Sequence, residues 1–372
     1  MTIPTTNIKV TASYIELEKI PDLKFYVNHR NHWISYVAIA YVLVGYGLSL
    51  FCITTNIWWL NLLGVLLLIH NLTWAALFLH EFFHHNIFSS HRLNVVFGEI
   101  MLFLTGSCYS VFSNVARHHI AHHVRRADFS PFHPFSMSDF LQSLPKPVQR
   151  LVVLLEWLCI PAVNLLFRWM IALSPFLGQN RRDERLRNAL LLLLRGSLFT
   201  ALAIYSPRGI ICYFIAYISF LNIIQFLECF QHTYSVFHID GKVPKHSQKY
   251  DENNTYSLVL SPRWSWLSSL IFLNNNYHNA HHRLMSCPWY LLPRLDDELY
   301  SRSYQQYIGV SKLLKNYFRY RIHRLFQGQG TVDKTEKGLD IEKFAGATGM
   351  SFMLQRKPFD WLKLSSSVSS NN

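Results

Sequence analysis

Four long runs of apolar residues limit what this chain can fold into more than any other feature of its sequence. Each run contains no acidic residue and approaches the ~20 residues that a helix needs to cross the ~30 Å hydrocarbon core of a bilayer. Backbone groups in lipid must be hydrogen-bonded within their own segment, so such runs are expected to be helices. Only a few residues separate the two members of each pair, which predicts two helical hairpins. The predicted spans are residues 34–53, 57–79, 188–206 and 209–227.

The overall composition agrees with a membrane protein. Half of the residues are apolar, only 15% are charged, and the formal net charge is +13. A chain this apolar is not expected to be a soluble nucleic-acid-binding protein. Cytoplasmic loops rich in Lys and Arg explain the excess of positive charge, and a basic surface for an acidic redox donor or acyl carrier is a second interpretation. The six cysteines form no C-x-x-C pair, so neither a disulfide framework nor a zinc–thiolate site is expected.

Many of the nineteen histidines are concentrated in three clusters. Residues 80–85 read H-E-F-F-H-H, residues 118–123 read H-H-I-A-H-H, and residues 278–282 read H-N-A-H-H. Positions three and four apart share one face of a helix, so each cluster can point two or three imidazoles in one direction. Glu228 and His232 repeat the four-residue spacing at the end of the last apolar run. The co-facing histidines of the clusters are His80 and His84; His119, His122 and His123; and His278, His281 and His282.

This set of nitrogens is typical of a metal centre larger than a structural zinc site. Histidine is the commonest metal ligand in proteins, and eight or nine co-facing imidazoles can surround two ions with room left for oxygen. A structural zinc site needs only four ligands, commonly including thiolates. The number and softness of the nitrogens favour iron, with copper as an alternative. A membrane metal transporter is the competing function, although transporters usually place polar residues near mid-membrane, whereas these clusters flank the apolar runs.

A shared metal centre requires every cluster to lie on the same side of the membrane. Either of the apolar segments 93–116 and 151–174 would break that rule if it crossed the bilayer, so the first is expected to be interfacial or re-entrant and the second interfacial. In the second segment, Glu156 and Arg168 would each raise the free energy of membrane insertion by ~2.5–3.5 kcal/mol at a helix centre. The predicted fold is an all-α membrane protein with four transmembrane helices in two hairpins, interfacial helices and a histidine-rich cap on the cytoplasmic side. The expected parts are a cytoplasmic N-terminal segment (1–33), the membrane domain with its cap (34–310), and a basic C-terminal segment with a partly disordered tail (311–372).

The clusters, in the order H-x-x-x-H, H-x-x-H-H and H-x-x-H-H, resemble the histidine boxes of the membrane fatty acid desaturase and hydroxylase superfamily. The resemblance covers about residues 34–295 and is specific in the boxes. Residues 276–293, N-Y-H-N-A-H-H-R-L-M-S-C-P-W-Y-L-L-P, are similar to the family's stretch that ends in P-W-Y-x-L-P. The segment E-C-F-Q-H-T-Y at 228–234 matches the family's additional histidine, and H-H-V-R-R-A-D at 122–128 follows the second box as in the family. Family members generally have Glu where Ala280 stands, so one outer acid is expected to be missing here.

The resemblance implies two iron ions, O2 as co-substrate and attack on an unactivated C–H bond of a fatty acyl chain. Desaturation by a non-haem di-iron oxidoreductase is the leading hypothesis, with a hydroxylase, a carotenoid oxygenase or an alkene-forming fatty acid decarboxylase as alternatives. His85 and His118 are alternate ligands, because the doubled histidines allow a shift of one residue. The implied role of Glu81, Asp128 and Glu228 is to orient imidazoles or hold a water. The implied metal ligands are His80, His84, His119, His122, His123, His232, His278, His281 and His282.

An external electron donor is a further expectation. The sequence contains no flavin or nicotinamide fingerprint and no iron–sulfur cysteine pattern, so electrons must arrive from another protein. A ferredoxin or a small cytochrome that docks on the basic face is the hypothesis. The other expected partner is a membrane lipid or acyl substrate, and no nucleic acid is expected.

Overall fold

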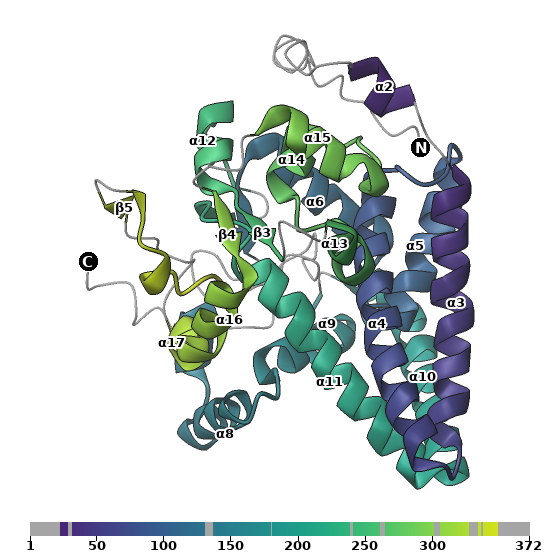
Figure 1. Ribbon diagram of the computed structural model, residues 1–372. Coiled ribbons are helices and arrows are strands. Elements are labelled where there is room, and N and C mark those ends of the chain that lie inside the picture. Colours follow the sequence, from purple (N-terminus) through teal and green to yellow (C-terminus); the bar gives the residue numbers. More distant parts are fainter. Residues whose placement is uncertain are drawn as a thin grey trace.

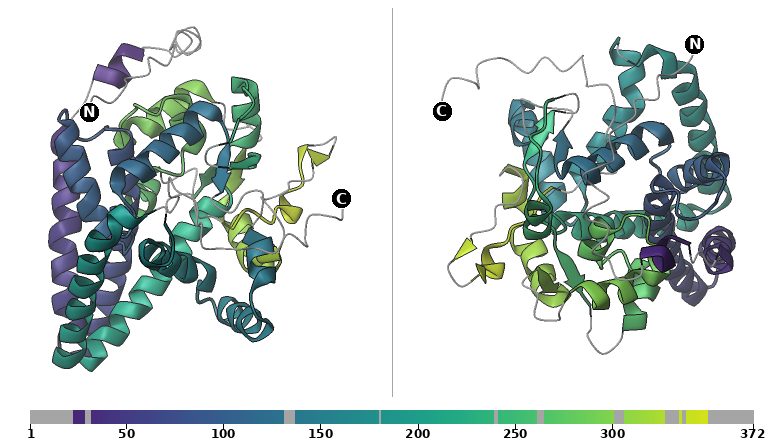
Figure 2. Two further views of the ribbon diagram at one scale, coloured as in Figure 1. Left: turned by 180° about the vertical axis from the view of Figure 1, so that it is seen from behind. Right: turned by 90° about the horizontal axis from the view of Figure 1, so that it is seen from above.

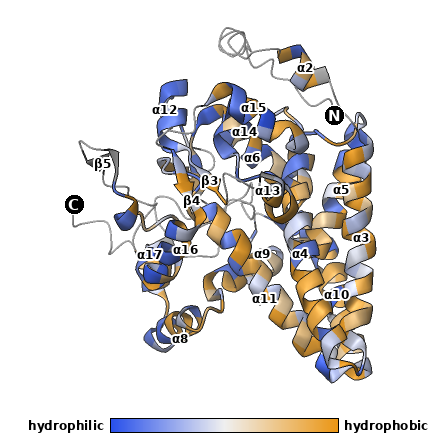
Figure 3. Cartoon of the chain, viewed as in Figure 1, coloured by the Kyte–Doolittle hydropathy of each residue, from blue (hydrophilic) through white to orange (hydrophobic). Residues whose placement is uncertain are grey.

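The computed structural model shows a helical protein built from two regions (Figure 1). One region is a bundle of long apolar helices, and the other is a more polar cap of short helices and strands over one end of that bundle (Figures 1 and 3). The described residues are 23–28, 32–130, 137–179, 181–238, 241–260, 265–300, 306–326, 334–335 and 338–348.

Four helices within the described residues are long and apolar enough to cross a membrane, which confirms the predicted number of spans. They are α3 (His32–Thr54), α4 (Trp58–Phe83), α10 (Arg185–Tyr205, preceded by the 3-10 turn η1, Arg182–Glu184) and α11 (Pro207–Cys229). α3 packs along α4, and α11 packs against both, so the two hairpins form one bundle (Figures 1 and 2). α10 is the most exposed of the four and contacts α11.

Short polar motifs set where the spanning helices turn. Asn61 near the start of α4 donates a hydrogen bond from Nδ2 to the carbonyl oxygen of Cys52 at 3.0 Å, which closes the first hairpin. At the second hairpin the Ser206 hydroxyl accepts a hydrogen bond from the Gly209 amide at 3.0 Å, and Pro207 begins α11. Both motifs give partners to backbone groups that a helix end leaves without them.

Neither of the two further apolar segments forms a spanning helix, as predicted. The first is divided between α5 (His91–Leu104) and α6 (Phe112–Arg125) by a turn at Gly106, whose φ of +73° favours glycine. The second is divided between α8 (Lys146–Trp157) and α9 (Ala162–Leu177). Its buried Glu156 forms an ion pair with Arg321 at 2.9 Å, so the charge is not isolated. The position of these helices at the membrane interface stays a prediction.

Two arginines and a tyrosine hold the turn between α5 and α6. Arg168 of α9 donates a hydrogen bond to the carbonyl oxygen of Thr105 at 3.0 Å, and Arg195 of α10 donates to that of Phe103 at 2.6 Å. The Tyr217 hydroxyl of α11 donates to the same Thr105 oxygen at 3.1 Å. The last carbonyls of a helix carry partial negative charge, which favours nearby cations. Helices α9, α10 and α11 therefore fix the start of α6, the helix that carries the second histidine cluster.

The rest of the described chain forms the cap and the elements beside it. β1 pairs in parallel with β2, and β3 in parallel with β4. The first pair joins the end of α6 to the segment that follows α11, so two histidine-bearing segments are tied together. The predicted division at residues 33 and 310 stays a prediction, and the predicted disordered tail lies outside the described residues. These elements are α2 (Leu23–Asn28), β1 (Asp128–Ser130), α7 (Met137–Ser143), β2 (Val236–His238), α12 (Gln248–Asn254), β3 (Ser257–Val259), α13 (Ser265–Phe272), α14 (His278–Arg283), η2 (Trp289–Leu291), α15 (Leu292–Leu299), β4 (Tyr307–Gly309), α16 (Val310–Arg319), α17 (Arg321–Phe326), β5 (Lys334–Thr335), β6 (Gly338–Leu339) and η3 (Ile341–Lys343).

Candidate metal centre

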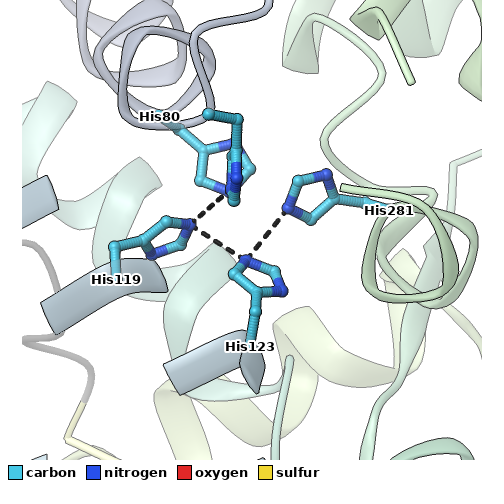
Figure 4. Close-up of side chains that lie close together, drawn as sticks. His80, His119, His123 and His281 are labelled. Atoms are coloured by element: carbon cyan, nitrogen blue, oxygen red, sulfur yellow. Dashed lines mark hydrogen bonds between the residues drawn. The ribbon is translucent and has the colours of Figure 1, made fainter. Parts of the chain in front are cut away.

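Five of the predicted ligands converge where the end of α4 meets α6 and α14, and Figure 4 shows four of them labelled around a common space. One nitrogen of each ring lies within 4.8 Å of the corresponding nitrogens of the other four. The spacing of four residues, at the end of α4 for His80 and His84 and within α6 for His119 and His123, places the two imidazoles of each pair on the same face. We call this set the five-histidine group: His80, His84, His119, His123 and His281.

The ring nitrogens of this group make more close contacts with one another than hydrogen bonds can account for. The Nε2 atom of His119 lies 2.9 Å from that of His84 and 3.0 Å from that of His123. The His123 Nε2 atom also lies 3.2 Å from the Nε2 atom of His281. A neutral ring nitrogen carries either one proton or one lone pair, so the Nε2 atoms of His119 and His123, which each make two such contacts, cannot satisfy both by hydrogen bonds. A shared cation would account for all three contacts.

A second set of imidazoles lies directly beside the first. His122, His232 and His282 have ring nitrogens within 4.8 Å of one another, and we call them the three-histidine group. His278 joins it through His232, because their Nε2 atoms are 2.7 Å apart. The rings of His282 and His123 have centroids 4.1 Å apart and link the two groups. The structure thus brings all nine predicted ligands together, and their role as ligands stays a prediction.

His282 provides a direct test of whether these residues suit a metal ion. Its Nδ1 atom lies 3.2 Å from Asp251 Oδ1. Its Nε2 atom is buried and has no hydrogen-bond partner among the described residues. A buried polar atom without a partner is costly, and an imidazole held through Nδ1 with a free Nε2 is the usual arrangement of a metal-binding histidine. The site therefore fits a metal.

Burial keeps most of these rings in the form that binds metals. Desolvation lowers the pKa of seven imidazoles well below the ordinary value of 6.5, and neighbouring histidines lower it further. Metal binding requires the neutral imidazole. The seven are His84, His119, His123, His232, His278, His281 and His282.

The three acids predicted to support the ligands differ in where they lie. Asp128 Oδ1 is 3.0 Å from His122 Nδ1, close enough to orient that ring. Glu81 is buried, and its Oε1 atom is 3.8 Å from His80 Nδ1, too far for a direct hydrogen bond. Glu228 is buried at the end of α11 and makes no hydrogen bond to a histidine among the described residues.

The alternate ligands lie outside both groups. His85 has a φ of +55°, and its ring stacks on His91 with centroids 4.7 Å apart. His118 is buried and belongs to neither group. The structure therefore places His84 and His119, rather than their doubled neighbours, at the centre.

Sequence reasoning missed Asp251, which supports the three-histidine group. Besides facing His282, Asp251 accepts a hydrogen bond from the Tyr234 hydroxyl, and Arg126 lies 3.5 Å away. Desolvation raises the pKa of Asp251, and its bonds to Tyr234 and Arg126 oppose the rise. Asp251 follows no motif, and only its spacing of four residues from Thr255 hints at a shared helix face.

Two further missed residues face imidazole nitrogens. Thr255 Oγ1 is 3.3 Å from His232 Nδ1. Asn275 Nδ2 is 3.3 Å from His80 Nδ1. Asn275 lies three residues before the third cluster, so its position in the sequence was a usable signal, whereas that of Thr255 was not.

A pocket of about 310 Å³ reaches this centre from the cap. Its wall includes His123 and His282, one residue from each group, together with Arg126, Asp251 and Arg283. The side of the centre that faces the cap is therefore accessible to polar molecules.

Comparison with known families identifies the family to which a chain with this centre belongs. The model of the fatty acid desaturase family matches residues 57–313, which include all nine histidines and three of the four spans. The chain belongs to the fatty acid desaturase family. The comparisons with curated proteins and with solved structures gave no match.

Membership in the desaturase family confirms the predicted resemblance and the broad function. At the level of the family the chain is a fatty acyl oxidoreductase, and the family uses iron, for which the histidine groups are suited. Together with the four apolar helices, membership also identifies a membrane protein.

Replacing Asp251 tests its support of this desaturase-family centre. Asp251→Asn keeps the size of the side chain and removes the charge that faces His282. We expect the iron affinity of the three-histidine group to fall about 10- to 100-fold, as for other outer partners of metal-binding imidazoles. Competition with a chelator measures the affinity. Asp297→Asn, at an exposed position of α15, is the control. Equal affinities for the two variants would show that Asp251 does not orient His282.

The lowered imidazole pKa values predict that the metal-free protein loses stability in mild acid. These histidines stay neutral in the folded state, whereas in the unfolded state they take up protons below pH ~6.5. The unfolded state then binds more protons, so the free energy of unfolding decreases as the pH falls. Each such histidine contributes up to about 1.4 kcal/mol per pH unit. Thermal unfolding of the metal-free protein from pH ~7.5 to ~5.5 measures the effect, and a constant stability would contradict the assignment.

Proposed function

We propose that the chain is a di-iron, O2-dependent oxidoreductase that desaturates a fatty acyl chain. The observation that carries the proposal is the convergence of nine histidines from four separate segments into two adjacent groups at one end of a membrane bundle. Two iron ions held there would supply the O2 activation that breaking an unactivated C–H bond requires, because no side chain can provide it.

The residues around the centre support an apolar approach from the bundle. Phe83 at the end of α4 lies with its ring centroid 5.5 Å from that of His119 and 5.3 Å from that of Phe112. Both phenylalanines are almost completely buried. These rings exclude water on the side of the five-histidine group that faces the bundle, whereas the polar pocket lies on the side of the cap. The centre therefore has apolar rings on the side of the bundle and the polar pocket on the side of the cap, as an acyl substrate and a polar reactant would require.

The charge distribution supports a cytoplasmic position of the centre. Arg181, Arg182, Arg185 and Arg187 lie at the start of α10, at the end of this span away from the α10–α11 turn. The α3–α4 turn at the opposite end of the bundle, residues 54–57, contains no Lys or Arg. Positive charge accumulates in cytoplasmic loops, so we place the histidine groups on the cytoplasmic side.

Replacing a single histidine tests the proposed function. The purified chain should contain iron and consume O2 when supplied with electrons, and His122→Ala should abolish turnover while the protein still inserts into the membrane. His323→Ala, at an exposed position of α17 outside both groups, is the control. Mass spectrometry of the acyl product identifies the reaction: loss of two hydrogens indicates desaturation, and gain of one oxygen indicates hydroxylation. Iron binding without O2 consumption would support the transporter alternative instead.

An acidic electron-transfer protein is the partner that we propose for this centre, docked at the mouth of the polar pocket. The pocket brings solvent to His123 and His282, so electrons have the shortest entry there. Exposed cations lie at the end of α6 and before and within α12, the two helices that contribute residues to the pocket wall. Four of these cations form no ion pair with a described residue: Arg125, Lys242, Lys245 and Lys249.

Reversing two of these charges tests the docking site. Lys245→Glu with Lys249→Glu should raise the KM for a reduced acidic ferredoxin roughly tenfold at low salt, because charges at the rim of an interface act mainly on association. Turnover at saturating donor should be unchanged. The matched control is Lys312→Glu with Lys315→Glu, two exposed lysines of α16. An equal KM in both double variants would place the donor elsewhere.

A further inference from the structure

The C-terminal segment that follows η3 is buried against the end of α11, although its sequence carries no recognisable motif. Phe344 is completely buried, and Ala345 and Ala347 are nearly so. α16 contacts both η3, which precedes this segment, and α11. The segment 344–348 therefore belongs to the folded wall of the protein, beyond the membrane domain predicted to end at residue 310.

Side chains of α16 and α17 fix the backbone of this segment. Asn316 donates hydrogen bonds from Nδ2 to the carbonyl oxygens of Ile341 at 2.5 Å and Phe344 at 3.1 Å. Arg324, itself buried, donates from Nε to the carbonyl oxygen of Ala345 at 2.8 Å. A buried arginine and a buried asparagine that both bond to backbone carbonyls define a single position for the segment.

Close packing then joins the segment to the last turn of α11. The Ala347 amide donates to the carbonyl oxygen of Cys229 at 2.8 Å. Gly346 has a φ of +76°, and a Cβ atom added there would lie 2.7 Å from the Cys229 oxygen and 2.8 Å from Phe230 Cε1. Only glycine fits this approach, because any side chain would collide with the backbone of Cys229.

The same segment reaches the backbone that carries His232. The Phe344 ring contacts those of Phe230, at a centroid distance of 5.2 Å, and Tyr256, at 5.4 Å. Phe230 and Tyr256 flank an antiparallel bridge that pairs His232 with Thr255. In that bridge the Tyr256 amide donates to the Gln231 oxygen at 2.9 Å, and the Thr233 amide donates to the Asn254 oxygen at 3.0 Å.

We propose that Phe344 and Gly346 are positioning residues for His232, and hence for metal binding at the three-histidine group. Phe344 holds both sides of the bridge, and Gly346 allows the segment to approach the end of α11. The five-histidine group is carried by α4, α6 and α14, and none of its rings contacts Phe344 among the described residues. The segment therefore acts on one group and not on the other. This inference rests on the proposed metal-binding function.

Two measurements on matched variants test the proposal. Phe344→Ala removes the ring that joins Phe230 to Tyr256, and Phe344→Leu keeps an apolar side chain there. Phe318→Ala makes the same change at an exposed position of α16 and serves as the control. Hydrogen exchange of the Thr233 and Tyr256 amides reports on the bridge without any metal. Titration of the metal-free protein with Fe²⁺ reports separately on the tighter and weaker sites.

We expect faster exchange of the Thr233 and Tyr256 amides in Phe344→Ala, together with an affinity about 10- to 100-fold weaker at one of the two iron sites and an unchanged affinity at the other. Phe344→Leu should restore most of both properties, Gly346→Ala should resemble Phe344→Ala, and Phe318→Ala should resemble the wild type.

Wild-type exchange and affinity in Phe344→Ala would overturn the proposal, as would equal weakening of both sites. A wild-type protein that binds no iron would instead contradict the proposed function, and amide exchange would still test the support of His232.

Discussion

The burial of nine imidazoles beside one another is the constraint on which the rest of the structure depends. Removed from water and packed together, several of their buried nitrogens have no hydrogen-bond partner among the described residues, so the cluster is costly unless a cation is bound or each ring is held firmly. Asp128, Asp251 and Thr255 reduce this cost, because each of them contacts the Nδ1 atom of one ring. They fix three rings through one nitrogen and leave the other free to face the centre.

The membrane-spanning helices determine at which end of the bundle this centre lies. α4 carries its histidines on its last turn and on the residue that follows, and α11 ends three residues before His232. Both helices therefore deliver ligands at the same end of the bundle. α6 is not a span, yet its position is equally well defined, because Arg168, Arg195 and Tyr217 hold the turn that precedes it. The two arginines lie in apolar helices and donate hydrogen bonds to backbone carbonyl oxygens of that turn.

The spans and the histidine positions could be predicted from the sequence because both depend on short-range periodicity. A run of apolar residues sets the length of a helix, and a spacing of four residues sets which rings share a face. The support of the centre could not be predicted in this way. Asp251 meets His282, and Phe344 meets Phe230, only through tertiary contacts between segments that no local pattern connects. At Glu228 the local pattern was misleading. Its spacing of four residues from His232 suggested that the two side chains are partners, but His232 lies beyond the end of α11, where helical periodicity no longer holds.

The two histidine groups differ in a way that bears on how a pair of metals would share the reaction. The five-histidine group has more nitrogens, but its nearest acid, Glu81, stands 3.8 Å from His80. The three-histidine group has fewer nitrogens, yet Asp128 and Asp251 both contact its rings. Carboxylates on Nδ1 make an imidazole a stronger donor, so the acids compensate for the smaller number of ligands. An ion bound in that group would have fewer protein ligands and so more open coordination positions. Asp128 and Asp251 would balance its charge through the imidazoles that they contact. Under the proposed function, that makes the three-histidine group the more accessible of the two to a small polar reactant from the pocket.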